Sequence, residues 1–252
     1  MKVIAFTIQN IPLIQEGDDI GRIISERAEI EEYDIIVVSS TIVSKSEGRV
    51  ISLNNVKVTE RAEIIAKKIG NDARFVQAVL DQSKEILLES PFLLVRNHIG
   101  NICVNAGIDR SNIEGEDNIL LLPEDADKSA REIKEAIFKH TGKKVSVIIT
   151  DTSGRAFRIG QTGVAIGVAG ITTTIDWRGT KDLFGKMLEV KNEAVVDEIS
   201  GFANLLMGEG DGATPVVIIR GLRLYQERCS ITQIYRTEEE DVISKALKSH
   251  SA

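Results

Sequence analysis

The stretch VSVIITDTSGR, residues 145–155, joins an apolar run to a short polar segment with a glycine. Its first part, Val145–Ile149, hardly alternates in polarity, and neither does most of a second run, Asp34–Val38. Runs of this kind are typical of strands that are covered on both faces, as in the sheets of α/β proteins. We therefore predict a strand at each place, in a sheet with helices on both sides.

Other short β-branched runs, and the amphipathic patterns between them, predict the remaining elements. Strands are expected at Val3–Phe6, Leu93–Val95 and Val216–Ile219, and a buried strand with close backbone contacts within the glycine-containing segment Gly160–Gly179. Helices are expected from Asp18 or Asp19 to Ala28, and at Glu60–Ile69, Asp72–Gln82, Ala126–His140 and Glu193–Met207. In the helix Ala126–His140, the side chains of Ile133, Ile137 and Phe138 should face the core.

The predicted fold class is α/β (α+β mixed), with a mixed β-sheet and flanking helices. Residues 1–252 should form a single compact unit in which two interleaved lobes share a core. The composition suits a globular protein of this size, with 252 residues, 42% of them hydrophobic and 27% charged. We find no Pro- or Ser-rich linker that would divide the chain.

Charge and cysteine content exclude several classes of protein. The chain has 31 Lys and Arg against 38 Asp and Glu, a net charge of −7, whereas nucleic-acid binders usually have a basic excess. The sequence contains no signal peptide and no run near the roughly 20 apolar residues of a membrane helix. The two cysteines, Cys103 and Cys229, have no metal-ligand spacing. We expect a cytoplasmic protein with reduced cysteines and with neither nucleic acid nor membrane as a partner.

Polar side chains follow both of the predicted buried strands. Asp151 and Thr152 offer hard oxygens that suit Mg²⁺ or Mn²⁺, at the end of a strand where open α/β sheets hold ligands. The alternative is that both residues make local turn bonds. After the other strand come Ser40, Thr41 and Lys45, and the lysine could supply positive charge for a polyphosphate, or be an ordinary solvated lysine.

Two further segments could join the same site. Asp109 could be a second carboxylate for a metal and Asn112 a hydrogen-bonding partner for a base or ribose, or the two could form a simple turn. The segment from Gly208 to Thr214 alternates glycine with other residues, so its amides could face an anion, or it could be a flexible connector. Since no GxxxxGK[ST] motif occurs, the inventory favours a nucleotide site outside the P-loop class.

Together these segments resemble the coenzyme F420-0:γ-glutamyl ligase family, in its stand-alone archaeal form. The blocks follow the family's order and cover nearly the whole chain: IPLI, SSTIVSKSEGR, ICVNAGIDRSN, VIITDTSGRAFRIG, DWRGTKDLFGK, ANLLMGEGDG and IYRTEEEDVI. The resemblance implies GTP-dependent ligation of L-glutamate to F420-0, a deazaflavin phosphodiester. A second glutamate then follows through a γ-linked amide, and GDP and phosphate are released.

The resemblance also implies residue roles and partners. It implies a homodimer that uses two divalent cations, Mg²⁺ or Mn²⁺, and a monovalent cation such as K⁺. One divalent ion would be held by Asp109 and Asp151, and the other by Thr152 and Glu209. GTP binding carries over onto Ile11, Pro12, Leu13, Ile14, Ser40, Thr41, Lys45, Asn112, Met207, Gly208, Glu209, Gly210, Asp211, Gly212, Ala213 and Thr214.

The implied chemistry agrees with the residue types. A carboxylate is a poor electrophile, whereas an acyl phosphate made from it can be attacked by an amine. Cations would neutralise the γ-phosphate, and Lys45 would stabilise the transferring charge, so Lys45, Asp109 and Asp151 are the expected catalytic residues. Two rival functions use the same inventory: a metal-dependent phosphohydrolase, and a non-catalytic GTP-binding regulatory protein.

Overall fold

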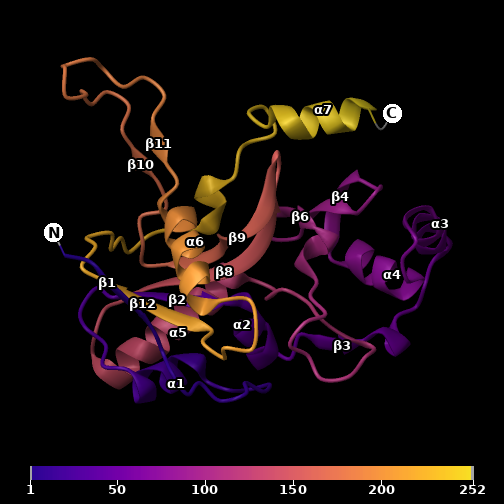
Figure 1. Ribbon diagram of the computed structural model, residues 1–252, viewed down its shortest axis with the longest axis horizontal. Coiled ribbons are helices and arrows are strands. Elements are labelled where there is room, and N and C mark those ends of the chain that lie inside the picture. Colours follow the sequence, from indigo (N-terminus) through magenta and orange to yellow (C-terminus); the bar gives the residue numbers. More distant parts are fainter. Residues whose placement is uncertain (1, 251–252) are drawn as a thin grey trace.

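The protein, described over residues 2–250 by a computed structural model, is built around a five-stranded mixed sheet (Figure 1). The strand order is β1 (Ile4–Thr7), β12 (Val216–Arg220), β2 (Ile35–Ser39), β8 (Ser146–Arg155) and β9 (Arg158–Ala169). β2 and β8 are parallel, and the other neighbouring pairs are antiparallel. The predicted mixed sheet is therefore confirmed.

Helices cover both faces of this sheet, as the non-alternating strands predict. Ile36 of β2 packs in one core with α1 (Ile20–Arg27) and α5 (Ala126–Thr141). Its neighbour Val37 packs in a second core with α6 (Val195–Met207) on the opposite face. Figure 1 shows α1 and α5 on one side of the sheet and α6 on the other.

Glycines allow α5 and α6 to approach β9 closely. A Cβ atom at Gly167 would lie 2.4 Å from the main-chain carbonyl of Ala126 at the start of α5. A Cβ atom at Gly163 would lie 2.5 Å from the main-chain oxygen of Ser200 in α6. The close backbone contacts predicted for residues 160–179 are thus present, and they fix both helices against the same strand.

A second lobe is formed by residues that lie between β2 and β8 in the sequence. It has a hydrophobic core of its own. This core contains buried residues such as Ile65, Val76 and Ile119. The lobe includes α3 (Glu60–Ile69), α4 (Ala73–Asp81), the pair β3 (Val50–Ser52) and β7 (Asn118–Leu120), the sheet β4 (Ser83–Leu88), β5 (Leu94–Asn97) and β6 (Ile102–Val104), and the 3-10 turns η1 (Leu53–Asn55) and η2 (Asn105–Gly107). Figure 1 shows this lobe beside the main sheet.

Some expected boundaries are wrong. The helix expected from Glu193 begins at Val195, because Glu193 pairs in β11 (Asn192–Glu193) with β10 (Ile175–Asp176). Phe138 does not face the core: it is 51% exposed, whereas Ile133 and Ile137 are buried as expected. The segment after β2 forms an unexpected helix, α2 (Ser40–Ser46). The remaining elements are η3 (Ile231–Ile234) and α7 (Val242–His250).

An arm formed by residues 175–193 projects from the body and carries β10 and β11 at its base (Figure 1). Three apolar side chains on this arm, Leu183, Phe184 and Val190, are almost fully exposed. Phe157, at the turn between β8 and β9, is also exposed. Cys103 and Cys229 are free, and among residues 2–250 no helix has the length and apolar character needed to span a membrane.

Candidate functional site

The site begins where β2 ends beside β8, which does not end after the predicted buried run but continues through Asp151 and Thr152 to Arg155 in a hairpin with β9. Ser39 of β2 pairs in register with Thr150 of β8, so the next residues, Ser40 and Asp151, lie side by side. The Ser40 hydroxyl donates to Asp151 Oδ1 across 2.7 Å. Ser39 also caps α2, since its hydroxyl accepts from the Thr41 amide. The turn from strand to helix therefore brings the serine hydroxyl to the carboxylate.

Asp151 has an unusual electrostatic environment. The residue keeps some exposed surface, but its carboxyl group lies deep in the wall of the site. Burial raises the pKa of Asp151 to about 6; the Ser40 hydrogen bond opposes this shift, and the Asp109 carboxylate and, more weakly, Glu209 add to it. Because these carboxylates lie close enough to repel one another, a cation bound between them would be stabilised.

The next residue of β8 belongs to a second polar group. The Thr152 hydroxyl lies 2.9 Å from Glu209 Oε1 and 3.2 Å from Asn204 Oδ1. The Asn204 amide nitrogen donates to the same Glu209 oxygen across 2.8 Å. Asn204 was not among the residues predicted from the sequence. Its position in the last turn of α6 was the available signal, because asparagine is a poor residue for a helix interior.

The second lobe contributes Asp109 and Asn112. Asp109 accepts from the amide and the hydroxyl of Ser111, at 2.7 and 2.8 Å, so the turn that the sequence left as an alternative is present. From the opposite wall, the Lys45 ammonium donates to the main-chain oxygen of Asn112 across 2.6 Å. Lys45 is therefore not a freely solvated lysine, because it joins α2 to the loop that carries Asp109.

These groups line one cavity of about 770 Å³. The loop after α6 forms part of its rim and is closed on itself by the Thr214 hydroxyl, which donates to the Met207 carbonyl across 3.0 Å. Gly212 is the one predicted residue that does not line the cavity. The predicted residues that do are Ile11, Pro12, Leu13, Ile14, Ser40, Thr41, Lys45, Asp109, Asn112, Asp151, Thr152, Met207, Gly208, Glu209, Gly210, Asp211, Ala213 and Thr214.

The donor set is suited to cations that a nucleotide helps to bind. Among residues 2–250, no three side chains of the Asp, Glu, His or Cys type are placed to hold one ion together. Mg²⁺ usually takes one or two carboxylates and completes its shell with water and substrate phosphates. Asp109 with Asp151, and Thr152 with Glu209, fit that pattern. The cavity therefore suits a metal–nucleotide complex better than a metal bound by protein alone.

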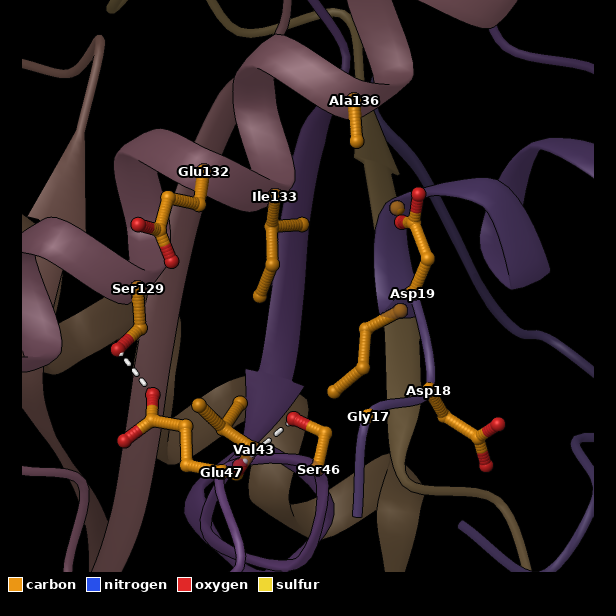
Figure 2. Close-up of a pocket in the computed structure, with 12 residues that line it drawn as sticks. Gly17, Asp18, Asp19, Val43, Ser46, Glu47, Ser129, Glu132, Ile133 and Ala136 are labelled. Carbon is orange, nitrogen blue, oxygen red and sulfur yellow. Dashed lines mark hydrogen bonds between the residues drawn. The ribbon is translucent and has the colours of Figure 1, made fainter. Parts of the chain in front are cut away.

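A smaller cavity of about 310 Å³ lies between α1, α2 and α5 (Figure 2). Three of its four acidic side chains make hydrogen bonds that support the fold, and the fourth, Glu132, forms an exposed ion pair with Lys128. Glu47 accepts from the Ser129 hydroxyl, Asp19 caps α1 by accepting from the Arg22 amide, and Asp18 accepts from the Gln15 amide. This cavity therefore offers no comparable set of converging ligands.

A family model and three relatives that match this chain all carry the name of one kind of ligase. A family model described as F420-0:Gamma-glutamyl ligase matches residues 9–221. A protein of Archaeoglobus fulgidus named coenzyme F420:L-glutamate ligase is 53% identical, over 98% of this chain and 99% of its own length. Proteins of the same name from Methanosarcina barkeri and Haloarcula marismortui are 52% and 44% identical, each over 98% of this chain and 97% of its own length.

Proposed function

Because the chain belongs to the F420-0:gamma-glutamyl ligase family, we propose that it is a ligase that joins L-glutamate to coenzyme F420-0. The bond would be an amide between a carboxyl group of the coenzyme and the amine of glutamate. A second glutamate would follow through a γ-linked amide. We also propose a cytoplasmic location, with which two free cysteines agree.

One observation supports this function above the others. Side chains from four separate segments meet in a single cavity, and they combine oxygen ligands with a lysine. Ser40 contacts Asp151, Thr152 contacts Glu209, and Lys45 contacts the main chain of Asn112. A site that activates a carboxylate with a nucleoside triphosphate needs both kinds of group, because charge must be bound before and during phosphoryl transfer.

We propose that GTP supplies the activation. The carboxylate oxygen of F420-0 attacks the γ-phosphorus, the bond to the β-phosphate oxygen breaks, and GDP leaves. The glutamate amine then attacks the carbon of the acyl phosphate and inorganic phosphate departs, so the amide forms with loss of one proton. Lys45 would stabilise charge on the transferring group, and the loop Met207–Thr214 with Ile11–Ile14 would bind the nucleotide.

Two divalent cations, Mg²⁺ or Mn²⁺, would be held by Asp109 with Asp151 and by Thr152 with Glu209. When bound, they would supply positive charge for the triphosphate in a wall that is otherwise acidic. A monovalent cation such as K⁺ remains part of the proposal on the strength of the family resemblance.

We further propose a homodimer. The exposed apolar side chains of the arm, Leu183, Phe184 and Val190, support it, because soluble chains seldom leave such residues grouped in water. The arm projects well beyond the body that carries it (Figure 1).

A product assay tests the function directly. The protein is incubated with GTP, Mn²⁺, L-glutamate and F420-0, and products are separated by mass. We expect F420-0 to gain one glutamate and then a second, with GDP formed over many turnovers only when all reactants are present. Sustained GDP release without F420-0 would indicate a phosphohydrolase instead, and GTP binding without turnover would indicate a regulatory protein.

A further inference from the structure

The structure assigns to Asn204 the role of a positioning residue, which orients Glu209 and Thr152 so that together they can hold a divalent cation. Asn204 touches both of these side chains, and no role was predicted for it from the sequence. The inference rests on the proposed metal-dependent function. It concerns the ion expected at Thr152 and Glu209, and not the one expected at Asp109 and Asp151.

The first argument is the pairing of both ends of the amide. Asn204 Nδ2 donates to Glu209 Oε1 across 2.8 Å, and Oδ1 lies 3.2 Å from the Thr152 hydroxyl. Because the carboxylate of Glu209 can only accept, the nitrogen of the amide must face Glu209 and the oxygen must face Thr152. The Thr152 hydroxyl has one proton, which it can donate either to Asn204 Oδ1 or to Glu209 Oε1, so all three side chains are held in one cluster.

The second argument is that Glu209 needs such a restraint. It lies on the exposed loop that follows α6, just after Gly208, which has a φ of +72°. A glutamate on an exposed loop has many rotamers, and binding an ion would require one of them. The Asn204 amide and the Thr152 hydroxyl both contact Glu209 at Oε1, so Oε2 remains as a metal ligand. Side chains that orient ligands in this way typically change metal affinity by about 10–100-fold when removed.

The third argument is that the fold holds Asn204 rigidly. α6 lies against β9 at a glycine, since a Cβ atom at Gly163 would be 2.8 Å from Asn204 Cβ. The helix therefore has little freedom to move Asn204 away from Thr152, which lies on the neighbouring strand β8. The position of the Glu209 carboxylate, which lies on the loop, is thus set by Asn204 on the rigid helix α6.

Two substitutions separate the hydrogen bonds from the volume of the side chain. Asn204→Ala removes both, whereas Asn204→Leu removes the polar contacts and keeps the size. Leu205→Ala is the matched control, because Leu205 is the exposed neighbour on the same turn and does not line the cavity. Asp151→Asn is a variant in which the other ion, expected at Asp109 and Asp151, should be lost.

The measurement is Mn²⁺ binding in the presence of GDP, followed by calorimetry and by the electron paramagnetic resonance of free Mn²⁺. In the wild-type protein we expect two ions. In both Asn204 variants the affinity for one ion should fall about 10–100-fold, while the other ion and the Leu205→Ala protein are unchanged. In the ligation assay, the KM for Mn²⁺ should rise, with kcat at saturating Mn²⁺ retained within a few-fold.

Several results would overturn the inference. They are two unchanged Mn²⁺ affinities in both Asn204 variants, fewer than two ions in the wild type, or loss of folded protein in both Asn204 variants while Leu205→Ala remains folded. A wild-type protein that makes no product but shows the selective loss of one Mn²⁺ in the Asn204 variants would overturn the proposed function and leave the inference intact.

Discussion

Asp151 carries a carboxyl group whose ionisation opposes folding when no cation is present. Its pKa is raised from 3.8 to about 6, so between these values the folded protein binds more protons than the unfolded chain. The free energy of unfolding of the metal-free protein should therefore fall as the pH rises through this window, by at most about 3 kcal/mol.

Asp151→Asn should remove this dependence. In chelator, the variant should be more stable than the wild type above about pH 7, and the difference should vanish below about pH 4. Adding Mn²⁺ with GDP should stabilise the wild type more than the variant, which keeps only the ion expected at Thr152 and Glu209. Urea unfolding across the pH range measures both effects, with the exposed Glu238→Gln as control. Parallel stability profiles for wild type and Asp151→Asn would contradict the assigned pKa.

Lys45 is expected to matter for turnover far more than for folding. Its ammonium donates to a main-chain oxygen near the surface, so Lys45→Ala should cost about 1 kcal/mol of stability or less. Loss of a group that stabilises transferring charge typically costs about 100–1000-fold in kcat. Steady-state ligation and thermal unfolding are compared with Lys143→Ala, which replaces an exposed lysine just after the C-terminal cap of α5. Near-normal kcat/KM in Lys45→Ala would remove the lysine from the mechanism.

At the scale of elements, the contact of α5 with β9 depends on the absence of a side chain at Gly167. Gly167→Ala would place a Cβ atom 2.4 Å from backbone atoms of Ala126, which cannot rotate away. We expect a loss of about 3 kcal/mol in the free energy of unfolding. Gly154→Ala is the control on the same hairpin, because a Cβ atom there meets nothing within 4 Å. Equal unfolding midpoints for the two variants would contradict the close packing.

The sequence predicts long amphipathic helices and buried strands well, and short elements poorly. The helix Glu60–Ile69 is confirmed, and it ends at Gly70, which has a left-handed backbone conformation. α2 escaped prediction because residues such as Thr41, Ile42 and Val43 have low helix propensity; the helix is supported by the cap at Ser39 and by burial of its apolar face. Strands as short as Val50–Ser52 contain too few residues to show the alternation of apolar and polar side chains by which a strand is recognised.

The candidate site was predictable as a list of residues, and less so as a geometry. In the sequence, Asp151 and Ser40 come directly after two buried apolar runs, so their meeting can be inferred if the strands formed by those runs are parallel neighbours, although β8 in fact continues past Asp151. The contact of Asn204 with Thr152 depends on how α6 packs on the sheet, which local patterns do not encode. Long-range packing thus decides which polar residues reach the cavity.

At the scale of the whole molecule, the exposed arm predicts self-association. Light scattering should give twice the chain mass of 27.6 kDa at micromolar concentration. Replacing Leu183 and Phe184 together by serine should favour the monomer, because it removes exposed apolar surface without touching either core. Ile64→Ser, on the exposed face of α3, serves as the control. A wild-type particle of 27.6 kDa would contradict the homodimer.

The position of β12 has a consequence for the newly synthesised chain. This strand leaves the ribosome long after β1 and β2, yet it inserts between them. Until residues 216–220 emerge, β1 lacks the neighbour that joins it to the sheet and β2 presents an open apolar edge. Nascent chains stalled before this point should therefore be targets for chaperones and proteases. The cavity cannot be complete until β12 has emerged, because Pro215, directly before this strand, is part of its lining.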